Sequence, residues 1–161
     1  MTCRSCGGVA SGLVCAYCGA LQGQISHADD EQRAVEEFHA ILARTTGADA
    51  RLRLLQSGFV PTHPAPLIDA ALRCVPLLDN TMTADSPVAS ATYARLQILA
   101  AKLRVIATTP EVKRALAELA PHLAKQRNAQ LWAGFTNVVI GLGIALVFGC
   151  AGIIWLAGAL Q

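Results

Sequence analysis

The sequence predicts a mainly α-helical protein, and three observations support that fold class. Four of the six cysteines lie between residues 3 and 18, in two closely spaced pairs. Apolar residues recur at spacings of three and four through much of residues 28–123, as they do along one face of a helix. Residues 131–161 contain no Asp, Glu, Lys, Arg or His. We therefore expect a compact metal-binding module at residues 1–22, a small helical bundle at 23–127 and a single C-terminal transmembrane helix at 128–161.

The N-terminal cysteines follow the spacing C-x2-C-x8-C-x2-C in the segment CRSCGGVASGLVCAYCG. Two thiolates separated by two residues can face one ion from a single tight turn. The glycine after each pair, Gly7 or Gly19, can adopt the positive φ that turns backbone N–H groups toward the sulfur atoms. A short hairpin through residues 10–12 would join the two turns. The predicted ligands of a tetrahedral metal site are Cys3, Cys6, Cys15 and Cys18.

The chemistry of this predicted site favours a structural Zn²⁺ ion. No apolar leader precedes the cysteines, and paired CxxC motifs without an export signal favour a metal over disulfides. Four thiolates fill the coordination shell of zinc and leave no position for a catalytic water. The module has few apolar residues, so metal binding, about 10–16 kcal/mol in zinc-finger peptides, would supply its folding free energy. Iron in a rubredoxin-like site and a redox-active dithiol use the same residues and remain alternatives.

Residues 1–22 resemble the short bacterial zinc-ribbon family, whose CxxCG…CxxCG pattern falls on the four cysteines and on Gly7 and Gly19. The resemblance implies a small metal-stabilised ribbon of the kind found at the N-termini of membrane or multi-domain proteins. This chain departs from the family in one respect, because the proline usual inside each turn is replaced by Arg4-Ser5 and Ala16-Tyr17. The ligands are intact, and the resemblance does not extend beyond residue 22.

The middle of the chain predicts a bundle of four or five short helices. Capping signals are expected at Ser26, Asp49, Ser86-Pro87 and Thr109-Pro110, where polar side chains or an N1 proline begin apolar periodic runs. Three prolines between residues 59 and 66 indicate an extended connection, and prolines at 76 and 121 predict a break and a bend. A pair of HEAT-like helical repeats is an alternative without a clear period. The expected helices cover residues 28–45, 49–57, 67–78, 88–107 and 110–123.

The sequence of this helical region contains no pattern that indicates catalytic activity. Its histidines lack HExxH or other ligand spacing, and no phosphate-binding or nucleophile-elbow motif is present. We interpret Glu36-Glu37 as a solvated helix face and Cys74 as a buried, inert thiol. The basic pairs Arg51 with Arg53 and Lys102 with Arg104 are interpreted as helix surface. The formal net charge is only +2, so the chain lacks the basic field that nucleic-acid binding usually needs.

The C-terminal run is long enough to cross a bilayer. A helix of about 20 apolar residues spans the hydrocarbon core, and Trp132 and Trp155 stand near the two ends of this longer run. Lys125 and Arg127 precede it, so the positive-inside rule places the N-terminal body in the cytoplasm. Arginine outnumbers lysine in the sequence, which points to a GC-rich bacterial genome. We expect a single-pass protein of a bacterial inner membrane. A buried hairpin of a soluble protein is the alternative.

Small residues recur every four positions in this run and predict close helix packing. Such a stripe suits either a membrane protein partner or self-association, although glycine is also simply common in membrane helices. The polar amide within the stripe can donate or accept a hydrogen bond across the contact. The residues of the stripe are Ala133, Asn137, Gly141, Ala145 and Gly149.

The function expected from these parts is that of a tail-anchored membrane protein without catalytic activity. Its cytoplasmic zinc ribbon and helical bundle would serve as a protein-interaction module or as an accessory subunit of a membrane complex. Two alternatives come from other functional classes. One is a membrane-tethered nucleic-acid-binding protein, and the other is a redox or metal sensor that uses the four-cysteine site.

Overall fold

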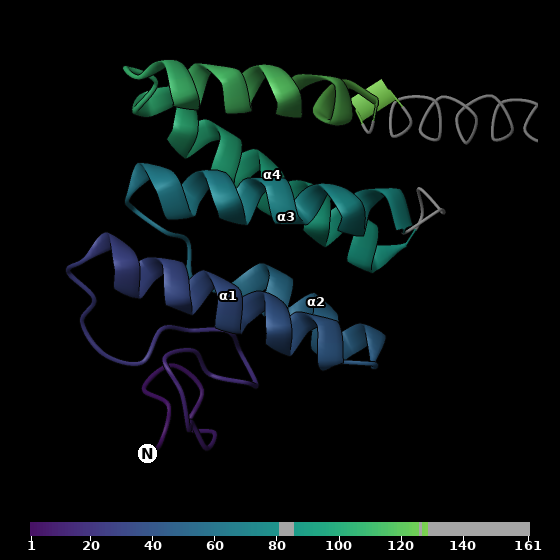
Figure 1. Ribbon diagram of the computed structural model, residues 1–161. Helices are drawn as coiled ribbons and strands as arrows, with labels where there is room; N and C mark the ends of the chain where they lie inside the picture. The colour runs from purple at the N-terminus through teal and green to yellow at the C-terminus, as the bar shows by residue number, and fades with distance from the viewer. Residues whose placement is uncertain (81–85, 126, 129–161) are drawn as a thin grey trace, which may run out of the picture. The chain divides into compact units, whose positions relative to one another are not determined.

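The computed structural model of the chain describes residues 1–80, 86–125 and 127–128. Within them, four helices follow a non-helical N-terminal segment, and residues 110–125 form a further helical stretch (Figure 1). Residues Met1–Ala124 form one compact unit. The described residues contain no β-strand, only two isolated antiparallel bridges within the first 21 residues. The helices are α1 (Ala28–Arg44), α2 (Ala48–Ser57), α3 (Pro64–Asn80) and α4 (Pro87–Val105).

Helix α1 confirms the predicted helix at residues 28–45. Its first turn contains Asp29, Asp30 and Glu31, which suit the positive end of the helix dipole. The predicted cap at Ser26 is wrong, because His27 occupies the N-cap position and makes no side-chain capping bond. The helix therefore begins on charge complementarity and on the burial of its inner face. That buried face consists of Glu31, Ala34, Val35, Phe38, Ile41 and Leu42.

Helix α3 begins earlier and continues further than the sequence predicts. Pro64 starts the helix because its fixed φ suits the first helical position. The carboxylate of Glu31 accepts hydrogen bonds from the backbone N–H groups of Thr62 and His63, at 2.8–3.0 Å, next to this N-terminus. Burial alone would raise the pKa of Glu31, but these bonds and the Thr62 hydroxyl hold its pKa below the ordinary value.

The predicted break at Pro76 is also wrong, because α3 runs through it to Asn80. The proline removes one backbone hydrogen bond, but it is exposed, and the buried face of α3 on the other side stabilises the continuous helix. The N-cap of helix α2 likewise lies two residues earlier than expected, at Gly47 rather than Asp49. The residues buried along α3 include Pro66, Leu67, Ala70, Ala71, Cys74 and Leu78.

Helix α4 and the helical stretch at residues 110–125 confirm two predicted helices, whereas the bend expected at Pro121 stays a prediction. Ser86 is the N-cap of α4 and Pro87 its first helical residue. The last predicted stripe is helical, with Val112 and Leu119 almost fully buried, and the helix continues through the position of Pro121. Leucines 96, 99 and 103 of α4 are each fully buried, so this helix lies at the centre of the bundle.

The core consists of two adjoining clusters, which Figure 1 helps to locate. One cluster joins α3, α4 and residues 110–125 through leucines such as Leu67, Leu99 and Leu119. The other joins α1, α2 and the N-terminal segment through Phe38, Leu54 and Val14. Figure 1 shows the N-terminal segment on one side of α1 and α2, with α3 and α4 on the other. The N-terminal segment is thus packed on the bundle and shares its core.

No helix within residues 1–80 and 86–125 is long and apolar enough to cross a membrane. The predicted transmembrane helix at 128–161 lies outside the described residues apart from residue 128. The small-residue stripe at Asn137, Gly141, Ala145 and Gly149 lies outside them as well. Both stay predictions from the sequence.

Candidate metal centre

The four predicted ligands converge on one point. The sulfur atoms of Cys3 and Cys18 are 3.7 Å apart and those of Cys6 and Cys15 are 3.8 Å apart. All four sulfur atoms lie within 4.8 Å of one another. Tetrahedral coordination with metal–sulfur bonds of about 2.3 Å separates the sulfurs by about 3.8 Å, whereas a disulfide needs about 2.05 Å. The thiols are therefore free, and their spacing suits four bonds to one metal ion.

The backbone around the cysteines repeats one pattern twice. The N–H of Gly7 donates to the carbonyl of Cys3 at 2.9 Å, and the N–H of Gly19 donates to that of Cys15 at 2.8 Å. Both glycines adopt the left-handed conformation, with φ of 73° and 72°, as the sequence predicted. A bridge closes each half, between Thr2 and Val9 and at the matching positions twelve residues later. Each half therefore presents its two thiols in the same way.

Cys3, Cys6, Cys15 and Cys18 form what we call the cage. Its electrostatics require a cation if all four thiols are to ionise. Hydrogen bonding from the backbone N–H of Cys6 lowers the pKa of Cys3 to about 6, despite the opposing effect of burial. The side-chain amide of Gln22 also donates to the sulfur of Cys3, at 3.2 Å. Burial, together with the neighbouring thiols, raises the pKa of Cys18 to about 12. The thiolate of Cys3 thus forms readily near neutral pH, while that of Cys18 needs a positive charge beside it.

Three of the four cysteines that form the cage are shielded from solvent. Cys3, Cys15 and Cys18 are buried, and Cys6 alone of the four is exposed. The small apolar cluster around it contains only these three cysteines and Ala10, with Ala20 packed beside them. Such a cluster buries too little apolar surface to hold the segment in this conformation by itself. Contacts with the helices, and an ion if the cysteines hold one, would supply the difference.

The second cysteine pair is hydrogen-bonded to the end of α2. The hydroxyl of Ser57 donates to the carbonyl of Cys18 at 2.6 Å. The backbone N–H of Phe59 donates to the carbonyl of Gly19 at 2.9 Å. Residues 18 and 19 belong to the metal-binding turn, so the helical bundle holds the backbone that positions a ligand. This makes α2 part of the support of the site.

Close packing of two glycines accompanies these bonds. A Cβ atom at Gly19 would lie 2.8 Å from the Cα of Gly58 and 2.8 Å from the ring of Phe38. A Cβ atom at Gly58 would lie 2.4 Å from the same ring. The guanidinium of Arg95 lies against the Phe38 ring, with Cζ 4.3 Å from the ring centroid. A chain of contacts therefore links the cage to the core. It runs from the turn at Gly19 to Gly58, then to the Phe38 ring, and then to the buried guanidinium of Arg95.

Arg95 is buried, and its partners are carbonyl groups at and beyond the end of α2. It donates to the carbonyls of Leu55, Gly58 and Phe59 at 2.7–3.4 Å. A cation at a helix C-terminus is favoured by the helix dipole, and these bonds satisfy carbonyls that the helix leaves unpaired. Burial lowers the pKa of this guanidinium, but arginine stays charged at neutral pH. Arg95 thus fixes the turn at Gly58 on which the metal-binding segment packs.

One interpretation of surface residues is corrected by this interface and another is confirmed. Glu37 was expected on a solvated face, but its carboxylate accepts a hydrogen bond from the backbone N–H of Leu13 at 2.9 Å. Arg53 is exposed, as expected of helix surface, and its guanidinium lies over the ring of Tyr17, 4.7 Å from the ring centroid. Both side chains extend from the helices to the N-terminal segment. The helical periodicity of the sequence predicts only that both side chains face outward. It does not predict that the N-terminal segment contacts them.

Cys74 takes no part in the cage. It is fully buried within the α3–α4 cluster, and burial raises the pKa of its thiol to about 11, in agreement with the expected inert cysteine. Within the described part of the chain, no other group of three or more His, Cys, Asp or Glu side chains could hold a metal ion. Comparisons with protein-family models, curated proteins and solved structures find no match to this chain. Its function must therefore be inferred from its own residues.

Proposed function

We propose that this protein is a membrane-tethered interaction module whose four-cysteine site holds a structural Zn²⁺ ion. The observation that carries the proposal is the construction of the cage. Four cysteine sulfurs at tetrahedral spacing leave no coordination position for water or substrate. The turn that supplies Cys18 is also hydrogen-bonded to α2. An ion held in this way stabilises a surface and has no open position for chemistry.

Zinc fits the site better than the other metals that thiolates bind. It has no geometric preference of its own and accepts the tetrahedral arrangement that the two cysteine pairs offer. The backbone N–H groups and Gln22 that approach Cys3 would spread the negative charge of a tetrathiolate site. Iron uses the same ligands and would reveal itself by visible absorption. The proposed zinc ribbon comprises residues 1–22, in keeping with the resemblance noted in the sequence.

The membrane tether of this proposal is supported by the uncharged run at residues 131–161. A basic pair at Lys125 and Arg127 supports a cytoplasmic position for the ribbon and the helices. The stripe at Asn137, Gly141, Ala145 and Gly149 supports packing against a membrane protein partner or a second copy. The soluble part would then act as an accessory subunit or adaptor at the membrane surface.

Purification of the full-length protein in a gentle detergent tests this function. We expect it in the membrane fraction, with one zinc per chain by elemental analysis and a stoichiometric partner or a second copy by mass spectrometry. A matched sample with Gly141→Leu should lose the partner and keep the zinc. Recovery of the wild-type protein from the soluble fraction, or as a metal-free monomer, would contradict the proposal.

The exposure of Cys6 favours one second candidate, a redox or metal sensor. Cys6 is the only ligand of the cage that oxidants can reach directly. Oxidation of its sulfur would remove one thiolate and weaken the hold on the ion. Release of zinc by mild peroxide, with recovery after addition of a thiol reductant, would support the sensor. A site that keeps its zinc under those conditions would exclude it.

A further inference from the structure

A cavity of about 210 Å³ lies at the junction of all four helices, far along the chain from the cysteine cage. Leu42 and Ala43 of α1, Leu55 of α2, Leu77 of α3 and Val88 of α4 form its apolar wall. Ala43 is exposed, so it stands at the mouth, whereas Leu42 and Leu55 are buried. An engineered apolar cavity of about 150 Å³ binds benzene, so this one can enclose a somewhat larger ligand.

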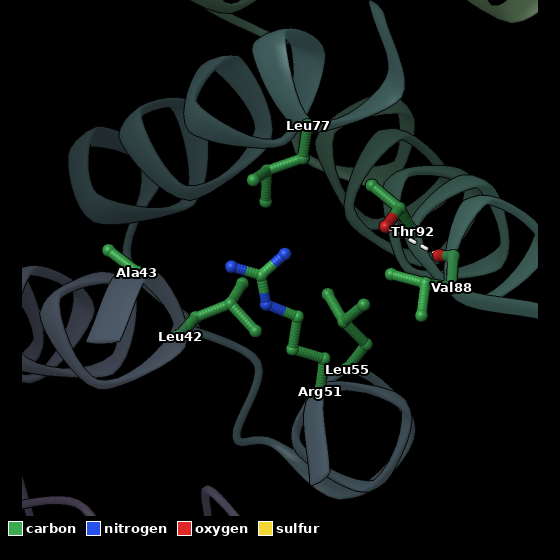
Figure 2. A pocket seen from close by; sticks show the side chains of 7 residues that line it. All are labelled: Leu42, Ala43, Arg51, Leu55, Leu77, Val88 and Thr92. Atoms are coloured by element: carbon green, nitrogen blue, oxygen red, sulfur yellow. Dashed lines mark hydrogen bonds between the residues drawn. The ribbon is translucent and has the colours of Figure 1, made fainter. Parts of the chain in front are cut away.

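A single charged group points into this apolar space. Figure 2 shows the guanidinium of Arg51 between Leu42 and Leu77, with the apolar side chains around it. Its Nε donates to the carbonyl of Thr45 at 2.5 Å. Within the described part of the chain, the two terminal nitrogens donate no hydrogen bond. A guanidinium carries five N–H donors, so four of them are free to meet a ligand in the cavity.

Arg51 has one structural role, because its Nε donates to the carbonyl of Thr45, the C-cap of α1. Among the described residues, that bond leaves the two terminal nitrogens without a partner, in the first turn of α2, where the dipole of α2 itself disfavours positive charge. Thr92, the other polar residue at the cavity, donates its hydroxyl hydrogen to the carbonyl of Val88 at 2.8 Å and so has no donor left (Figure 2). The unpaired donors of the cavity wall are thus concentrated on the guanidinium.

The two terminal nitrogens of a guanidinium match the two oxygens of a carboxylate. The rest of the wall offers leucine, valine and alanine side chains, which favour an apolar body. We propose that this cavity is a binding site for a small carboxylate with a compact apolar body of about ten non-hydrogen atoms. The carboxylate would pair with Arg51, and the apolar body would lie between Leu55, Leu77 and Val88. The site is independent of the metal centre and of the function proposed for it.

A pair of matched probes tests the proposal on the full-length protein. 3-Phenylpropionate carries the carboxylate, and 3-phenylpropanamide has nearly the same shape without the charge. Methyl NMR with labelled Leu and Val reports binding directly at Leu55, Leu77 and Val88. We expect saturable shifts of the methyl signals of these three residues with the carboxylate at millimolar concentration. The amide should bind about tenfold more weakly, equivalent to about 1.4 kcal/mol.

Three variants locate the site. Arg51→Met should weaken the carboxylate at least as much as loss of its charge does. Arg53→Met, on the same helix but directed at Tyr17, is the matched control and should leave binding unchanged. Ala43→Phe narrows the mouth while keeping Arg51, so it should weaken binding even if Arg51→Met disturbs the end of α1. Equal binding of the two probes, no saturable shift, or unchanged binding in both Arg51→Met and Ala43→Phe would overturn the proposal.

Discussion

The N-terminal segment and the helical bundle reach a fixed structure by different means. Residues 1–22 bury three cysteines, two alanines in part or whole, and little else around the cage. The bundle buries a series of leucines along α3 and α4, three of them on α4 alone without measurable exposure. Burial of apolar area can hold the bundle together, because each buried leucine contributes about 1.5–3 kcal/mol. The N-terminal segment places one fully buried aliphatic side chain, Val14, in the shared core, so we expect it to depend mainly on metal coordination.

The difference shows where the two parts depend on each other. The cysteine turn at Gly19 packs on Gly58 and Phe38, and Arg95 donates to the carbonyl of that glycine and lies over the Phe38 ring. A change at the cage should therefore reach the bundle through this contact, and a change at the contact should reach the cage. Variants that separate the two parts, or fail to, test this dependence.

Loss of a ligand should have the largest effect. Cys15→Ser removes a fully buried thiolate and should abolish metal binding, which supplies on the order of 10 kcal/mol to isolated zinc fingers. We expect residues 1–22 to unfold and the bundle to remain helical with a lower melting temperature. Elemental analysis and circular dichroism measure the two effects. Cys74→Ala is the matched control, and it should keep a full equivalent of metal. Full metal content in Cys15→Ser would disprove the ligand assignment.

The glycine contact should come next. Gly58→Ala adds a methyl group that would lie 2.4 Å from Phe38 and 2.6 Å from the carbonyl of Leu54. Overpacking of this kind costs about 1–3 kcal/mol, and it should also weaken metal affinity. The matched control is Gly47→Ala, because its methyl group would meet nothing closer than 3.9 Å. Chemical denaturation and a competitive zinc titration give both quantities. Equal stability of the two variants would show that the contact between Gly58 and Phe38 does not couple the metal site to the helical bundle.

The stability of the bundle should fall in mild acid because of His39. Burial, and then the charges of Arg95 and Arg73, lower the pKa of His39 from 6.5 to about 4. The unfolded chain binds the proton first, so stability is lost as the pH falls from 6.5 toward 4. We expect a loss on the order of 2 kcal/mol, less than the full shift would give, because the ring is half-buried. His39→Leu should flatten the pH dependence of the unfolding free energy over this range. If the unfolding free energy of His39→Leu depends on pH as steeply as that of the wild type, His39 is not the group that causes the loss of stability.

The smallest effect should come from Glu37 at the edge of the interface. Glu37→Ala removes the acceptor of the Leu13 N–H and should cost about 1 kcal/mol. Glu36→Ala, one position away on α1 and exposed, is the control and should be nearly neutral. Thermal melting distinguishes them, since 1 kcal/mol shifts the midpoint by about 2–4 °C for a chain of this size. If Glu37→Ala is as stable as Glu36→Ala, the hydrogen bond from Leu13 does not stabilise the interface, and the contact of Gly19 with Gly58 and Phe38 remains as its support.

The sequence predicted the cage because its chemistry is local. Two thiols and a glycine within five residues define each turn, so the spacing alone indicated the ligands and the positive φ at Gly7 and Gly19. The helices were predicted for a similar reason, since their apolar periodicity is a short-range signal. Pro76 was misjudged because the buried face of α3 outweighs one missing hydrogen bond.

The contacts between the two parts were beyond the sequence. Gly58 resembled an ordinary helix terminator, and Phe38 an ordinary core residue, until the fold brought them against Gly19. Arg95 carried no sequence signal for burial, because its acceptors lie 36–40 residues away along the chain. Arg51 was likewise assigned to the surface, and only the meeting of four helices gives it a cavity. Such long-range pairings are set by tertiary packing, which local pattern does not contain.

The most direct test follows hydrogen exchange in the full-length protein before and after metal is removed with a chelator. The informative amide is that of Phe59, which donates to Gly19, and the reference is the buried interior of α4 around Leu99. If the ion holds the N-terminal segment on the bundle, Phe59 should lose its protection with the metal while Leu99 keeps most of its own. Protection of Phe59 that persists in a sample shown to be metal-free would contradict a metal-dependent interface.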